Sequence, residues 1–118
     1  MIYHLAPAER WHAWPAEQPY LPAEFAADGF VHCTGESDTM LAVANRFYRG
    51  APGDFVMLLI DPARLSAPLR WEAPADPAPN AGPQLAPLFP HIYGPIDRAA
   101  IVDVRAVQRA ADGAFVGW

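Results

Sequence analysis

Three of the four histidines lie in short segments rich in aromatic and β-branched residues, which are typical of strands. They are His4, His32 and His91. An imidazole can donate or accept a hydrogen bond, and its charge can change near neutral pH. Each of these side chains could therefore bind an organic ligand, hold a metal, move a proton, or satisfy a backbone partner in the core.

The segment Gly29–Thr34 places an imidazole, a thiol and a hydroxyl on three consecutive residues. The period of two in a strand places Phe30, His32 and Thr34 on one face and Cys33 on the other. A helix signal follows at once, so His32 and Thr34 lie where a strand ends, a common place for a site. We expect Cys33 to be a small core residue rather than a nucleophile.

Two later segments add polar groups at strand positions. Glu72 ends the segment 69–72, and His91 and Tyr93 share one face of the segment 90–96. The long separations between the three histidines carry no metal-ligand spacing, so we expect no metal site. Structural histidines and a shared cleft for an organic ligand remain as alternatives. Arg46 lies off the apolar stripe of its helix, where it is either a solvated residue or a contact for an anionic ligand.

The remaining pattern predicts the elements that would position these side chains. Helices are expected at 8–14 and 37–49, with a loop at 17–28 that contains one helical turn. The apolar segment 55–60 predicts a central strand covered on both faces. Further strands are expected at 2–5, 29–34, 69–72, 90–96 and 100–109, with a return at 115–118. This order predicts an α+β fold with a bent, largely antiparallel sheet, split around a cleft, and two or three short helices.

Two more expectations concern the core and one proline-rich segment. We expect the core to include Val56, Leu58, Ile60, Met40, Val43, Phe47, Phe30 and Val102. The segment 73–90 contains six prolines and a single charge, Asp76. Prolines remove backbone donors, so this segment should form neither a helix nor a central strand. It is expected to be either a lid over the site or disordered.

Composition bounds the class of protein. A chain of 118 residues that is 53% hydrophobic is enough for a single domain over 1–118. The net charge is −5 and all basic residues are arginine, without a basic cluster, which argues against nucleic acid as a partner. The apolar runs are too short to span a membrane, and we expect a cytoplasmic protein. The single Cys33 excludes an internal disulfide.

Several of these segments together resemble a small bacterial family, the domain of unknown function 952 (DUF952). They are Ile2–His4, Gly29–Thr34, Ala44–Gly50, Leu59–Pro62, Arg70–Glu72 and Phe89–Ile96. The fold of that family is grouped with the ADP-ribosyltransferase superfamily, which splits NAD. The resemblance therefore implies an ADP-ribosyltransferase-like fold, with NAD as a candidate substrate rather than a known cofactor.

The same resemblance implies roles for individual residues. His4 is similar to the histidine that holds the NAD ribose, and as such it would donate a hydrogen bond to a ribose hydroxyl. His32 and Thr34 resemble a histidine and hydroxyl pair in RNA 2′-phosphotransferases. The third superfamily position falls on either Glu72 or His91, the two candidates for catalysis. We expect Arg46 and Tyr93 to lie close by.

Three functions follow from these observations. The first is an NAD-using or ADP-ribosyl-handling enzyme. The second is a non-catalytic module that binds a nucleotide-like small molecule. The third is an interaction protein whose histidines are purely structural.

Overall fold

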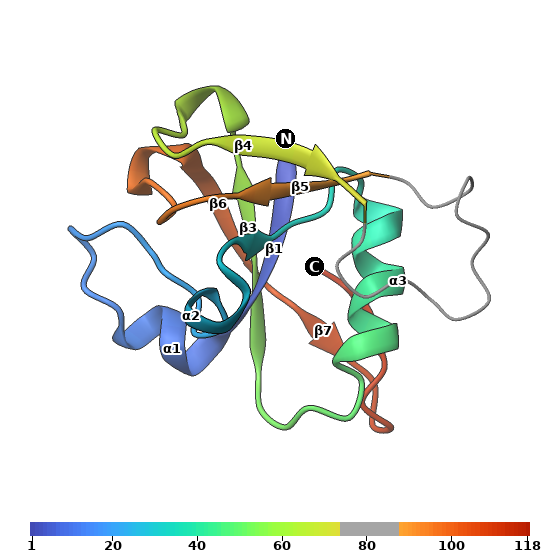
Figure 1. Cartoon of the computed structure of the whole chain (residues 1–118). Coiled ribbons are helices and arrows are strands. Elements are labelled where there is room, and N and C mark those ends of the chain that lie inside the picture. The colour runs from blue at the N-terminus through green and yellow to red at the C-terminus, as the bar shows by residue number, and fades with distance from the viewer. Residues whose placement is uncertain (74–87) are drawn as a thin grey trace.

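The computed structural model describes residues 1–73 and 88–118 and shows a mixed α+β arrangement (Figure 1). Its helices are α1 (Ala8–Ala13), α2 (Phe25–Asp28) and α3 (Ser37–Phe47), with 3-10 turns at Pro62–Arg64 and Arg98–Ala100. Its strands are β1 (Ile2–Pro7), β2 (Val31–His32), β3 (Phe55–Ile60), β4 (Leu69–Glu72), β5 (Phe89–Ile92), β6 (Ile101–Ala106), β7 (Gln108–Arg109) and β8 (Phe115–Gly117). In the described ranges, the helices are too short or too polar to cross a membrane.

The larger sheet has the order β1-β3-β6, and both pairings are antiparallel. All six residues of β3 are buried, as expected for an apolar central strand with both faces covered. Val56, Leu58 and Ile60 point to one side of the sheet, and the alternating residues Phe55 and Met57 point to the other.

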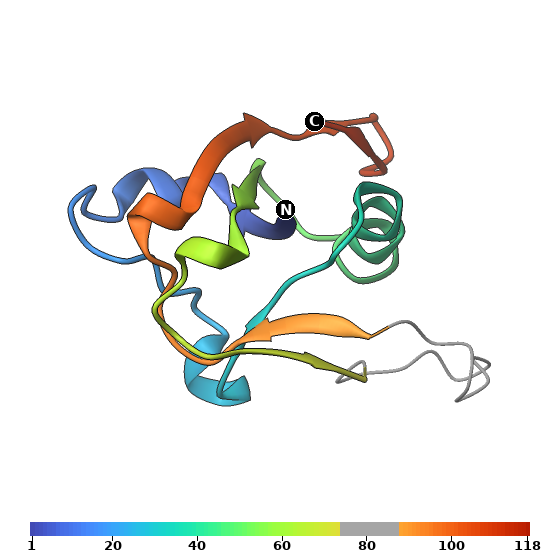
Figure 2. The ribbon, with the colours of Figure 1, turned by 90° about the horizontal axis from the view of Figure 1, so that it is seen from above.

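The smaller sheet has the order β2-β5-β4, again antiparallel, and it forms a separate layer (Figure 2). A bridge between Tyr3 and Thr34 joins the two sheets, with the amide of each residue donating to the carbonyl of the other. The expected split, largely antiparallel sheet is thus confirmed. The same bridge places the end of β2 beside His4 on β1.

Two apolar clusters surround the larger sheet. The first packs between the sheets and against Trp11 and Trp14, and the second lies between the larger sheet, α3 and Phe115 of the C-terminal hairpin. The hairpin of β7 and β8 confirms the predicted return at the C-terminus. Helix α3 therefore packs on the larger sheet, and Met40 and Val43 of this packed region also border a cavity.

The core expectations were only partly correct. Val56, Leu58, Ile60 and Met40 are buried, and Val43 and Phe30 are half-buried. The predictions that Phe47 and Val102 lie in the core are wrong, because their exposed fractions are 46% and 45%. Phe47 is the last residue of α3, beyond the stretch that packs on the sheet, and Val102 lies on the edge strand β6.

Several boundaries also differ from the prediction. The expected strand 29–34 is a strand only at Val31–His32, and the helix predicted to Arg49 ends at Phe47. Residues 74–87, most of the predicted lid, lie outside the described residues. Phe89, assigned to the same loop, belongs to β5 together with Pro90, which was predicted both as the end of that loop and as the start of the strand 90–96. β5 is the central strand of its sheet. The β2 ladder ends at His32, and beside Pro90 the Cys33 amide donates to the Pro90 carbonyl, which needs no proline N–H.

Candidate functional site

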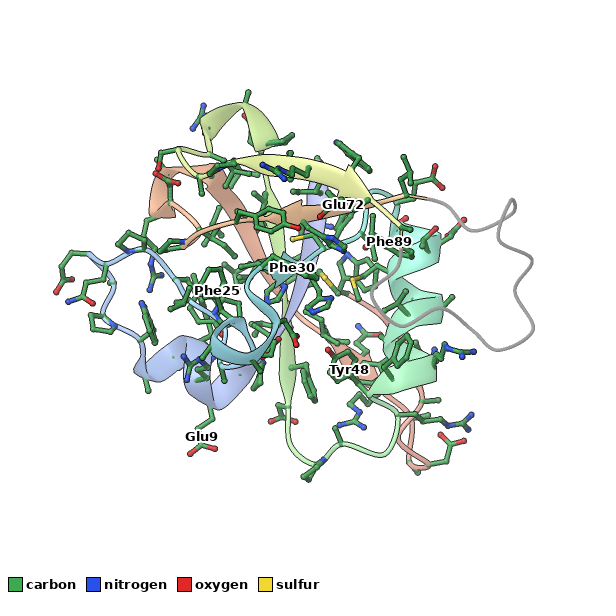
Figure 3. The ribbon with its side chains drawn as sticks, in the orientation of Figure 1. Glu9, Phe25, Phe30, Tyr48, Glu72 and Phe89 are labelled. Atoms are coloured by element: carbon green, nitrogen blue, oxygen red, sulfur yellow. The ribbon has the colours of Figure 1, made fainter. Side chains whose placement is uncertain are left out.

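A cavity of about 450 Å³ lies between the smaller sheet, β1 and α3. Its lining comes from five elements and the residues that adjoin them: His4, Leu5, Glu24, Asp28, His32, Cys33, Thr34, Met40, Val43, Phe47, Tyr48, Phe89 and His91. Phe89 reaches it from β5 and Tyr48 from the residue that follows α3; both side chains are labelled in Figure 3. This volume lies within the range of about 300–1,000 Å³ that is usual for small-molecule sites. We call it the histidine cavity.

His4 is 2% exposed, and its Nδ1 lies 2.7 Å from the carbonyl oxygen of His32. A carbonyl only accepts, so Nδ1 carries the proton. Burial lowers the pKa of His4, which keeps the ring neutral and leaves Nε2 as an acceptor. Nε2 has no partner among the described residues. In this tautomer the free nitrogen of His4 accepts a hydrogen bond rather than donating one.

Thr34 presents a second unpartnered group. Its side chain is buried, and Oγ1 makes no hydrogen bond within the described part of the chain. A buried hydroxyl without a partner costs about 1–3 kcal/mol. The two unpartnered atoms therefore belong to residues that lie side by side at the bridge between the sheets and line one cavity.

His32 is held by a carboxylate from the preceding helix. Its Nε2 lies 2.7 Å from Oδ2 of Asp28. Gly29 makes this contact possible, because its φ of 81° ends α2 in the left-handed region and turns the chain directly into β2. The pairing leaves Nδ1 of His32 for another partner.

His91, Glu72 and Tyr93 form a second polar group behind the cavity wall. Nδ1 of the buried His91 lies 3.0 Å from Oε1 of Glu72, and the Tyr93 hydroxyl donates to the same oxygen. The hydrogen bonds from Tyr93 and then His91 lower the pKa of Glu72, and the bond to Glu72 raises the pKa of Tyr93. The Phe30 ring stacks on His91 at a centroid distance of 4.1 Å. The Glu72 carboxylate only accepts, so Nδ1 of His91 carries a proton, and the Phe30 ring and Glu72 together fix the orientation of the imidazole.

The predicted site residues thus divide into three groups. His4, His32, Thr34 and His91 line the histidine cavity. Glu72 contacts His91, Tyr93 contacts Glu72, and neither of the two lines the cavity. Arg46 is exposed on α3 and does not line the cavity; its guanidinium lies 5.2 Å from the centroid of the Phe47 ring.

Sequence reasoning missed Glu24, Asp28, Tyr48 and Phe89 as lining residues. Asp28 precedes His32 by four residues, a spacing that becomes a contact only because Gly29 reverses the chain. Cys33 also lines the cavity, although it was expected on the opposite face, because β2 ends at His32 and the alternation ends with it. Burial raises the pKa of the Cys33 thiol, which opposes a role as a nucleophile.

Metal binding has no support in the geometry. In residues 1–73 and 88–118, no three side chains of the metal-ligating types come close enough together to hold an ion. Instead, the cavity offers hydrogen-bond acceptors, aromatic rings and two carboxylates to an organic molecule.

Comparisons with known proteins agree on the fold. A family model described as "Protein of unknown function (DUF952)" matches residues 5–104. Among solved structures, the protein CC0527 from Caulobacter crescentus is similar with a TM-score of 0.76 and 25% identity, over 98% of this chain and 92% of that one. A double mutant of the same protein is similar at 24% identity, with the same TM-score and coverage. No curated protein matches.

Proposed function

The chain belongs to the DUF952 family, and from that premise we propose that it binds a ribosyl-bearing small molecule, NAD or a related ADP-ribosyl compound, in the histidine cavity. The observation that carries the proposal is the pair of buried, unpartnered atoms, Nε2 of His4 and Oγ1 of Thr34. A ribose ring has adjacent hydroxyls that can donate to two such acceptors. The proposal extends to a distant relationship with ADP-ribosyltransferases, which the split antiparallel sheets support.

In this proposal His91 is the catalytic base and Glu72 is a positioning residue. Glu72 holds Nδ1 of His91, so that Nε2 can take a proton from an acceptor hydroxyl or water. The acceptor oxygen forms a bond to the ribose C1′ as the N-glycosidic bond of NAD breaks. Nicotinamide leaves with the electron pair of that bond as a neutral pyridine. Tyr93 keeps Glu72 in place through its hydroxyl.

Isothermal titration calorimetry of the full chain with NAD and ADP-ribose tests binding. Thr34→Val replaces the hydroxyl by a methyl group of similar size. It should weaken binding by about 0.5–1.5 kcal/mol while the free protein unfolds at the same or higher denaturant concentration. Thr39→Val on α3, outside the histidine cavity, is the matched control and should leave affinity unchanged.

Two results would count against the proposal. If neither ligand binds the wild type, the cavity does not take a ribosyl compound. If Thr34→Val lowers stability and leaves affinity unchanged, the hydroxyl is structural. Release of free nicotinamide from NAD, followed by chromatography, separates the enzyme from the non-catalytic binding module.

A further inference from the structure

The charges that line the histidine cavity are negative. Glu24 and Asp28 are its only acidic lining residues in the described part of the chain, and no arginine lines it there. The chain has no lysine, and residues 74–87 contain no basic residue in the sequence. That segment therefore has no cation to contribute. The Asp28 carboxylate is paired with the imidazole of His32. Glu24 makes no ion pair in the described ranges.

The buried imidazole of His4 offers the cavity an acceptor. Nε2 accepts because Nδ1 carries the proton and burial lowers the pKa of the ring. The Thr34 hydroxyl can accept as well as donate. A phosphate would meet the carboxylates of Glu24 and Asp28 without an arginine in the described lining to pair with. A ligand rich in donors or positive charge would instead satisfy these groups.

The charges of Glu24 and Asp28 act on the aromatic residues that line another part of the cavity. The pKa of Tyr48 is raised, first by burial and then by the charges of Glu24 and Asp28. Phe89 and the exposed ring of Phe47 complete this wall. Aromatic faces beside carboxylates are the usual surroundings of organic cations.

Three arginines, Arg46, Arg70 and Arg10, each contact an aromatic ring or a backbone carbonyl. The Arg46 guanidinium lies over the Phe47 ring, outside the lining, and that of Arg70 lies 5.2 Å from the Tyr93 centroid. Arg10 donates two hydrogen bonds to the carbonyl oxygen of Leu21. None of them lines the cavity in the described residues.

We propose that the histidine cavity selects a cationic aromatic riboside, and that phosphate groups of any ligand remain outside it. This inference rests on the proposed function and names the chemical class that the site takes. Glu24 is the residue that determines the charge preference. His4 and Thr34 receive the hydroxyl donors of the sugar, and Phe47, Tyr48 and Phe89 surround the charged ring.

Calorimetric titration of the full chain with three matched ligands tests the charge preference. Nicotinamide riboside carries a positive ring, benzamide riboside is its uncharged analogue, and nicotinamide mononucleotide adds one phosphate. We expect nicotinamide riboside to bind about threefold to tenfold more tightly than benzamide riboside at low salt. The mononucleotide should bind no more tightly than nicotinamide riboside.

Glu24→Gln should reduce the difference between the two ribosides, because it removes the charge and keeps the shape. Glu9→Gln is the matched control: Glu9 is exposed on α1 and points away from the molecule (Figure 3), and its variant should keep the full difference. Thermal melts of both variants establish that they are folded.

The possible failures are distinguishable. Equal affinity for the two ribosides, with NAD or ADP-ribose still bound, overturns the charge preference and leaves the proposed function in place. Tighter binding of the mononucleotide, abolished by Arg46→Gln, assigns Arg46 to a phosphate and also overturns it. Absence of binding by every ribosyl ligand rejects both.

Discussion

The central strands of the two sheets differ in what they bury. In β3 all six buried residues are apolar, whereas β5 places buried His91 between Phe30 and the carboxylate of Glu72. A buried imidazole is costly unless its nitrogens are hydrogen-bonded, and an apolar strand would have avoided that cost. The comparison teaches that the central strand of the larger sheet is devoted to apolar packing, whereas the central strand of the smaller sheet also buries a hydrogen-bonded polar group.

The largest expected effect tests the stabilising role of β3. Leu58 is fully buried, so Leu58→Ala should lower the free energy of unfolding by about 2–5 kcal/mol in a denaturant titration. Val102→Ala on the edge strand β6 is the control and should change it by at most about 0.5 kcal/mol. Equal losses in the two variants would break the distinction between centre and edge.

A smaller effect on stability is expected from His4, which is buried on β1 where the two sheets meet. Its pKa is lowered from the ordinary value of 6.5 mainly by burial, so below that pH the unfolded chain binds more protons than the folded one. Stability is therefore retained above pH 6.5 and lost as pH falls, by at most about 1.4 kcal/mol for each pH unit from this group.

The variant His4→Asn isolates that contribution, because its amide can still donate to the His32 carbonyl but does not titrate. Denaturant titrations between neutral pH and pH about 5 should show a shallower loss of stability in the variant than in the wild type. The same slope in both proteins would mean that His4 is protonated in the folded state as readily as in the unfolded one.

The smallest effect on the fold is expected at Glu72, which is partly exposed. Glu72→Gln should lower the pKa of Tyr93 toward its ordinary value of 10.0, because the hydroxyl loses its charged acceptor. Phenolate absorbance during an alkaline titration measures this shift, and Tyr93→Phe identifies which transition belongs to Tyr93. An unchanged titration would show that the hydrogen bond is not made in solution.

The same variant, Glu72→Gln, should also change how the free energy of unfolding depends on pH. The lowered pKa of Glu72 contributes stability above the ordinary carboxyl pKa, and this is lost in acid as pH falls through the folded value. The raised pKa of Tyr93 contributes stability that is lost as pH rises in the alkaline range. Glu72→Gln should flatten both limbs of the stability profile.

Much of the fold was predictable from local pattern. The run 55–60 had to be a central strand because it is apolar at every position, and 69–72 was placed to the residue. Phe89 was assigned only to the proline-rich segment because prolines are normally excluded from central strands. Only the packing shows why a proline fits here: beside Pro90 the chain after β2 uses the Pro90 carbonyl as an acceptor.

The site was predictable in part for the same kind of reason. The histidines and Thr34 were found because polar residues at the ends of apolar strands are conspicuous. Glu24 and Asp28 were missed because a carboxylate in a polar loop gives no local signal. Arg46 was predicted to lie close to the candidate site because a guanidinium can bind an anion. In the structure it does not line the cavity.

By itself, the sequence determined the residue types and the strands that carry them, because alternation and apolar runs are local properties. It also determined the absence of lysine and the negative net charge. Only the tertiary structure decided that His4 accepts rather than donates, since that depends on a carbonyl 28 residues away along the chain. The charge of the cavity was likewise decided by packing, which placed Glu24 and Asp28 in the described lining and left the arginines of the described residues outside it.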